Sequence, residues 1–158
     1  MVGCTFLPTP YCYRCFFELE YPKCHLRCAR ALEDIIRALG TDNLTTLSGR
    51  AEEISERGVA GTFDIVLARG VGPLVDLIRW SKPLVRRGPG PVGLPVGAGK
   101  KREVVPPALL AWKGGDVAAE VRLATTKTKV EHVEVVDLVF AGSSGFGLGG
   151  KKLIIVTL

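Results

Sequence analysis

Residues 43–74 constrain the fold more than any other part of the chain. Their order predicts a short strand at 44–47, a brief acidic helix at 50–57 and an apolar strand at 63–68. A near-continuous apolar run is typical of a strand that is covered on both faces, as in a parallel sheet. Pro73 then stands where a first helical residue is expected. Together these signals predict an α/β fold.

Polar residues follow both of these predicted strands. Ala51 and Glu52 come just after the turn that ends the first strand, and Arg69 ends the second. In an open parallel sheet, ligands bind beyond the carboxyl ends of the strands. We therefore expect the two groups of residues to open on one crevice.

The remaining elements follow from periodicity and from helix-stop signals. A helix is predicted at 24–39 with Gly40 as its stop, and a helix after Pro73 should end or kink at Pro83. The stretch 88–107 is so rich in Gly and Pro that it predicts a flexible loop. The other predicted elements are strands at 109–113, 130–140 and 153–158 and a helix at 116–126.

Length and composition indicate a folded chain of one ordinary domain. It has 158 residues, of which 47% are hydrophobic, and no run approaches the roughly 18 apolar residues of a membrane span. The first residues have no basic region before an apolar stretch, so no secretory signal is expected and the cytosol is the predicted location. We divide the chain into a Cys-rich segment at 1–30 and an α/β domain at 31–158, and nothing indicates an oligomeric state.

Four cysteines near the start have the spacing C-x2-C-x8-C-x3-C. They are Cys12, Cys15, Cys24 and Cys28. Two thiolate pairs could bind zinc tetrahedrally, although the eight-residue spacer is shorter than in common zinc ribbons. In a cytosolic chain, reduced structural thiols are the alternative. Both interpretations stay open.

The net charge of +5 is unevenly placed. Seven basic residues and no acid occupy 79–102, which we call the basic strip: Arg79, Lys82, Arg86, Arg87, Lys100, Lys101 and Arg102. Such a strip suits the phosphate backbone of a nucleic acid. The alternative is a solvated surface that keeps the protein soluble.

Four segments in a fixed order resemble a known family. They are GRAEE at 49–53, FDIVLAR at 63–69, LLAWKG at 109–114 and KLIIV at 152–156. Over about residues 32–158 the chain resembles the small-subunit ribosomal RNA methyltransferase G (GidB) family. The resemblance implies a Rossmann-like S-adenosylmethionine methyltransferase sheet whose last two strands are antiparallel, and methylation of a guanine N7 in ribosomal RNA.

The resemblance also implies roles for individual residues. Ala51, Glu52 and Arg69 would bind the cofactor, and Arg69 with Lys113 would form a positive floor that holds an RNA phosphate. Arg86 and Arg87 of the basic strip would face the nucleic acid. The alternatives are that Glu52 only stabilises a helix N-terminus, and that Arg69 and Lys113 pair with nearby acids.

One part of the methyltransferase pattern is missing from the sequence. Enzymes of this class have a strand and a glycine-rich turn ahead of these segments. The first forty residues, however, contain only two glycines, Gly3 and Gly40. Residues 8–36 instead resemble a segment of class III pyridoxal-phosphate aminotransferases that does not carry the cofactor lysine. We therefore expect the N-terminal glycine-loop unit to be lacking.

Three functional hypotheses remain. The chain could be a divergent or truncated methyltransferase, or a non-catalytic nucleic-acid-binding protein that keeps the late half of the sheet. It could also be a composite, chimeric or artificial chain that folds without enzymatic activity.

Overall fold

A computed structural model describes residues 4–6, 27–47, 51–69, 72–88, 94–96, 102–139 and 150–158. The chain divides into two compact units. We call residues 1–8 together with 51–158 the sheet unit, and residues 9–50 the helical unit. Residues 31–50 fall in the helical unit and residues 1–8 in the sheet unit, so this division differs from the predicted boundary at residue 30.

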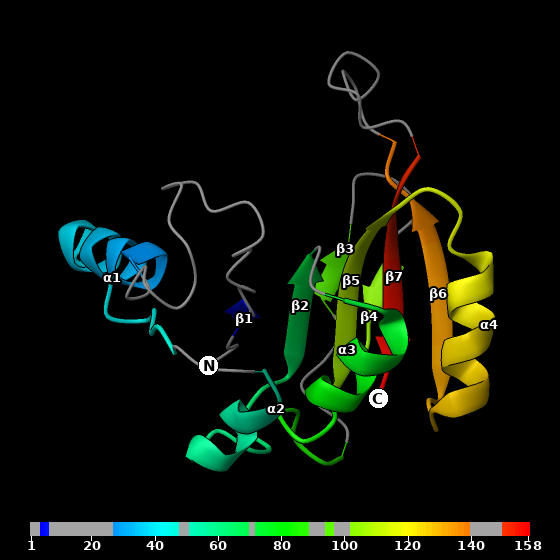
Figure 1. Ribbon diagram of the computed structural model, residues 1–158, viewed down its shortest axis with the longest axis horizontal. Helices are drawn as coiled ribbons and strands as arrows, with labels where there is room; N and C mark the ends of the chain where they lie inside the picture. Colours follow the sequence, from blue (N-terminus) through cyan, green and yellow to red (C-terminus); the bar gives the residue numbers. More distant parts are fainter. Residues whose placement is uncertain are drawn as a thin grey trace. The chain divides into compact units, whose positions relative to one another are not determined.

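The sheet unit contains a five-stranded sheet in the order β1-β2-β5-β7-β6 (Figure 1). Strands β1, β2 and β5 are parallel, whereas β7 is antiparallel to both β5 and β6. Strand β6 therefore has the same direction as β5, and the predicted antiparallel pairing of the last two strands is confirmed. This mixed α/β sheet agrees with the predicted Rossmann-like fold. The strands are β1 (Cys4–Phe6), β2 (Ile65–Arg69), β5 (Ala108–Gly114), β6 (His132–Asp137) and β7 (Lys151–Thr157).

Helix α3 lies between the two prolines that were predicted to mark its ends. Pro73 has an extended backbone (φ −60°, ψ 147°) and directly precedes α3, which ends before Pro83. The left-handed Gly58 (φ 81°) ends the 3₁₀ turn that follows α2. The bounds are α2 (Ala51–Ile54), η2 (Ser55–Arg57), α3 (Leu74–Ser81) and α4 (Ala118–Lys127).

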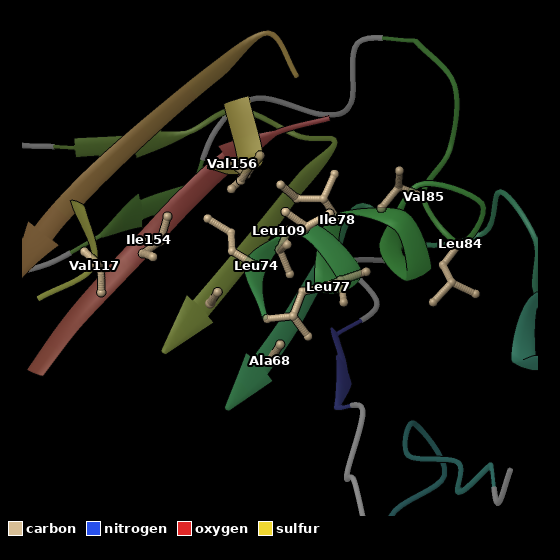
Figure 2. Close-up of a cluster of buried hydrophobic side chains, with 14 of the residues drawn as sticks. Ala68, Leu74, Leu77, Ile78, Leu84, Val85, Leu109, Val117, Ile154 and Val156 are labelled. Carbon is tan, nitrogen blue, oxygen red and sulfur yellow. The ribbon is translucent and has the colours of Figure 1, made fainter. Parts of the chain in front are cut away.

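Alternating side chains divide the strands between two hydrophobic clusters. On one face α3 and α4 cover the sheet, and Figure 2 shows Leu74, Leu77 and Ile78 of α3 gathered near Leu109 of β5. The other face holds a second cluster: Ile65, Val104, Ala108, Leu153 and Ile155. The strand residues are thus buried on both sides, which explains why β2 and β7 read as nearly unbroken apolar runs.

The structure differs from the flexible loop predicted at 88–107. Strands β3 (Leu94–Val96) and β4 (Arg102–Val104) form a separate antiparallel pair. Val104 is 1% exposed and belongs to the second cluster, so the pair is fastened to the sheet unit. Proline disfavours a central strand, but both members of a two-stranded ribbon are edge strands, where Pro95 is tolerated.

The structure also shows a strand that we did not predict. Residues 4–6 form β1, which pairs in parallel with β2 over Cys4↔Ile65 to Phe6↔Leu67. Three residues are too few to give a periodic signal. The strand position ahead of β2 is thus filled, but no glycine occurs between residues 4 and 39.

The helical unit contains α1 (Arg27–Leu39), which ends at Gly40 as predicted (φ 62°). The predicted strand at 44–47 is absent. Leu44 and Leu47 are exposed, and Thr46 Oγ1 donates to Glu33 Oε1 at 3.3 Å. A four-residue strand needs a paired neighbour, and these residues belong to the helical unit rather than to the sheet. Within the described ranges, no helix of either unit has the length and apolar character to cross a membrane.

Candidate functional site

The carboxyl ends of β2 and β5 form one edge of the sheet. The two strands are parallel, and Arg69, the last residue of β2, is in register with Trp112 of β5. Figure 2 shows the arrowheads of β2 and β5 side by side. Arg69 and Lys113 are therefore brought to the same edge, as their places in the sequence predicted. Arg69 is exposed and forms no ion pair with any residue that the structure describes.

Lys113 is held by two neighbouring groups at this edge. Its Nζ donates to Glu120 Oε1 at 2.7 Å and to the carbonyl of Gly72 at 2.6 Å. Glu120 Oε1 also accepts the backbone N–H of Leu74 at 2.7 Å. The Lys113 and Glu120 side chains are only 16% and 28% exposed. The alternative in which this strand-end lysine pairs with a nearby acid is thus what the structure shows.

The turn after β5 explains how Glu120 reaches Lys113. Gly115 has φ 76°, a conformation that favours glycine, and Asp116 Oδ1 accepts the N–H of Ala118 at 2.9 Å. This side-chain acceptor satisfies one free N–H at the start of α4. Glu120 then lies in the first turn of α4, directed back towards the strand end.

Arg86 lies at the opposite edge of the sheet. Its Nε is 2.8 Å from Oδ1 of Asp64, the residue that precedes β2, and its backbone N–H donates to the carbonyl of Phe63 at 2.9 Å. Asp64 and Arg69 are five residues apart along an extended strand. At about 3.3 Å per residue, they lie roughly 17 Å from each other. Arg86 and Arg87 are therefore not brought together with Arg69 and Lys113.

A shallow cavity of about 400 Å³ lies at this opposite edge. Its basic residues belong to the basic strip, but two of them are already engaged: Arg86 with Asp64, and Lys82 with the backbone carbonyl of Lys129. Arg87 is exposed. The lining residues are Lys82, Val85, Arg86, Arg87, Gly88, Pro107 and Leu158.

Among the other members of the basic strip, the structure describes the side chain of Arg79, which pairs with Asp76 at 3.7 Å. Lys100, Lys101 and the side chain of Arg102 lie outside what the structure describes. Three of the four described side chains of the strip, those of Arg79, Lys82 and Arg86, thus already have a partner within the protein.

Ala51 and Glu52 begin α2, and their side chains lie outside what the structure describes. Figure 1 shows α2 near the end of the sheet at which β2 begins, away from the end that bears Arg69. The structure does not bring this pair to the edge where Arg69 lies.

The predicted zinc ligands cannot be placed. Cys12, Cys15 and Cys24 lie outside the described residues, and Cys28 falls in α1 with its side chain undescribed. Among the residues that the structure describes, no group of three or more His, Cys, Asp or Glu could hold a metal ion. Zinc binding stays a prediction.

Comparison with known proteins assigns the chain to a family. Residues 24–104, just over half of the chain, match the family described as GidB, rRNA small subunit methyltransferase G. The chain belongs to the GidB family. The match begins at residue 24, within the segment 8–36 for which an aminotransferase resemblance was predicted, and that resemblance stays a prediction.

Curated relatives carry the same name as the GidB family. Ribosomal RNA small subunit methyltransferase G of Salinibacter ruber is 34% identical over 131 residues, which cover 81% of this chain and 53% of the relative. The proteins of that name from Thermobifida fusca and Chlorobium luteolum are 32% and 42% identical over 120 and 74 residues. These alignments cover 76% and 47% of this chain and 39% and 29% of the relatives. The chain spans about half the length of the Salinibacter relative and less of the other two.

The residues available for a GidB cofactor fit S-adenosylmethionine only in part. The sheet edge is present, with β1 beside β2 and Arg69 exposed at the carboxyl end. A glycine-rich turn after β1 is excluded by the sequence, in which Leu7 and Pro8 follow the strand. A pocket for the cofactor needs backbone that can approach it closely. The sequence after β1 has no glycine before Gly40 that would allow this approach.

Sequence reasoning missed two acids of this GidB chain. Asp64 stands at the head of the apolar run and Glu120 in the first turn of a weakly amphipathic helix. An acid directly before a buried strand was the available signal for Asp64. No spacing rule links Glu120 to Lys113, because Lys113 lies in a strand, Glu120 lies in a helix, and a turn separates the two elements.

Proposed function

We propose that this chain acts in ribosomal RNA modification, through S-adenosylmethionine-dependent methylation of a guanine N7. The observation that carries the proposal is the exposed Arg69 at the carboxyl edge of a sheet of GidB type. A guanidinium there suits a phosphate of the RNA backbone. Methyl transfer from a sulfonium to an existing lone pair depends mainly on positioning. The reaction therefore does not require a general acid or a general base at the sheet edge.

The predicted site residues enter this proposal with different support. Arg69 is exposed and Arg87 is exposed at the other edge, so both are available to RNA. Arg86 and Lys113 are engaged within the protein. Ala51 and Glu52 enter through the family resemblance alone.

One observation favours the non-catalytic alternative. The sequence that follows β1 has no glycine before Gly40. A protein that lacks the cofactor turn could keep the RNA-facing edge and bind RNA without methylating it. The two functions differ in cofactor binding.

Calorimetric titration with S-adenosylmethionine and with its demethylated product separates them. We expect binding tighter than about 0.1 mM, which corresponds to roughly 5.5 kcal/mol. RNA binding in the absence of detectable cofactor binding would instead support the non-catalytic function. If the chain binds neither the cofactor nor RNA, both functions are excluded for this chain.

Replacing Arg69 with glutamine should weaken RNA binding and reduce its salt dependence. A residue that neutralises one phosphate contributes about 0.7–0.9 to the slope of log K against log[salt], and Arg69→Gln should lose that contribution. Fluorescence anisotropy with a labelled ribosomal RNA fragment at several salt concentrations measures the slope. Arg122→Gln, an exposed arginine on α4, is the control for loss of one charge. An unchanged slope in Arg69→Gln would remove Arg69 from the RNA interface.

A further inference from the structure

We propose that Lys113 and Glu120 are a positioning pair that fixes the start of α3 beside the strand ends of the sheet, and that Lys113 does not bind a phosphate. The pair joins three elements at one point: the end of β5, the first turn of α4 and the start of α3. The effect of the pair on RNA binding rests on the proposed function, whereas its effect on amide exchange in the free protein does not.

The contacts converge on residues close to Arg69 in the sequence. Gly72 and Leu74 follow Arg69 by three and five residues, and each is bound by one member of the pair. Leu74 is the first residue of α3, so its N–H has no carbonyl partner inside the helix. Glu120 supplies the missing acceptor from a different helix.

Packing holds the same segment from the other side. A Cβ atom added to Gly72 would lie 3.5 Å from ring atoms of Trp80 on α3. Leu74 is fully buried. Gly72 and Leu74 are therefore held both by the pair and by packing within α3.

The geometry also argues against a phosphate role for Lys113. Two of the three ammonium N–H donors are used, at 2.6 and 2.7 Å, and the charge faces a carboxylate. Bringing a phosphate to this ammonium would place it beside Glu120, where like charges repel. Of these two cations, Arg69 has no ion-pair partner among the described residues, whereas Lys113 faces Glu120.

Amide hydrogen exchange in the free protein tests the pair without any ligand. In Glu120→Ala, the exchange rate of the Leu74 amide should rise about tenfold or more, since a hydrogen bond to a charged acceptor is lost. The Leu77 amide, which donates to the carbonyl of Pro73 at 3.0 Å, should change little. Glu120→Gln keeps the acceptor oxygen and should change the Leu74 rate less than Glu120→Ala does. Glu131→Ala, at an exposed position, is the matched control.

Salt-dependent RNA binding tests the role of Lys113. Lys113→Met should lower affinity while the slope of log K against log[salt] keeps its wild-type value. A phosphate contact would instead reduce the slope by about 0.7–0.9, as expected for Arg69→Gln. Lys127→Met, at an exposed position of α4, is the matched control.

The two experiments fail in distinguishable ways. If the wild-type protein binds no RNA, the proposed function fails while the exchange experiment still decides the inference. An unchanged Leu74 exchange rate in a folded Glu120→Ala protein, or a reduced salt slope in Lys113→Met, would overturn the positioning role.

Discussion

Replacing Leu109 with alanine should lower the free energy of unfolding by about 2–5 kcal/mol. Leu109 is fully buried near the start of β5, between β2 and β7, and lies in the cluster beneath α3 (Figure 2). The loss combines the transfer free energy of the missing methyl groups with the cavity that remains, because helix and sheet cannot both close on it. Domains of ordinary stability have only about 5–15 kcal/mol in total, so this one change should consume a large part.

Urea denaturation followed by circular dichroism measures the Leu109→Ala loss. The matched control is Leu123→Ala on α4, where the leucine is 46% exposed and the same change should stay within about 0.5 kcal/mol. Equal losses at the two positions would contradict the placement of Leu109 in the core.

Replacing Arg86 with methionine should lower the free energy of unfolding by about 2–4 kcal/mol. Asp64 is 1% exposed and its Oδ1 lies 2.8 Å from Arg86 Nε. Both carboxylate oxygens are buried without a hydrogen-bond donor among the described residues, so the contact with Arg86 is an ion pair and not a hydrogen bond. Without the guanidinium, the carboxylate is left as an uncompensated buried charge. We expect less than the full cost of breaking a buried pair because Arg86 itself is 44% exposed and water can reach the site.

A matched pair of variants isolates this ion pair. Arg87→Met removes the neighbouring arginine, which is exposed, and should cost less than about 0.5 kcal/mol. Adding Asp64→Asn to Arg86→Met should recover part of the loss, since the buried charge is then absent. If Arg86→Met and Arg87→Met are equally mild, Arg86 is a surface cation and the structural role assigned to it is wrong.

The Arg86 result bears on how the basic strip is understood. Seven cations between 79 and 102 predicted a surface for phosphates, but Arg79, Lys82 and Arg86 each have a partner inside the protein. The partners Asp76, Lys129 and Asp64 lie 3 to 47 residues away along the chain. Counting charges along a sequence cannot reveal partners that only folding brings near.

Local signals predicted most elements well. Pro73 and Pro83 bracket α3, Gly40 ends α1, and the apolar runs correspond to β2, β5 and β7. These signals act within one turn or one strand, so a sequence carries them in full. The errors occurred at 4–6, 44–47 and 94–104, where pairing decides whether a segment is a strand.

The amino-acid sequence alone therefore determined the α/β class, the family and the edge shared by Arg69 and Lys113, because parallel strands deliver their ends to the same side. Only the tertiary structure decided which of those cations is free. Glu120 reaches Lys113 across a turn and a helix start, and Asp64 reaches Arg86 across α3. Ion pairs depend on distances in space, and a linear pattern does not contain those distances.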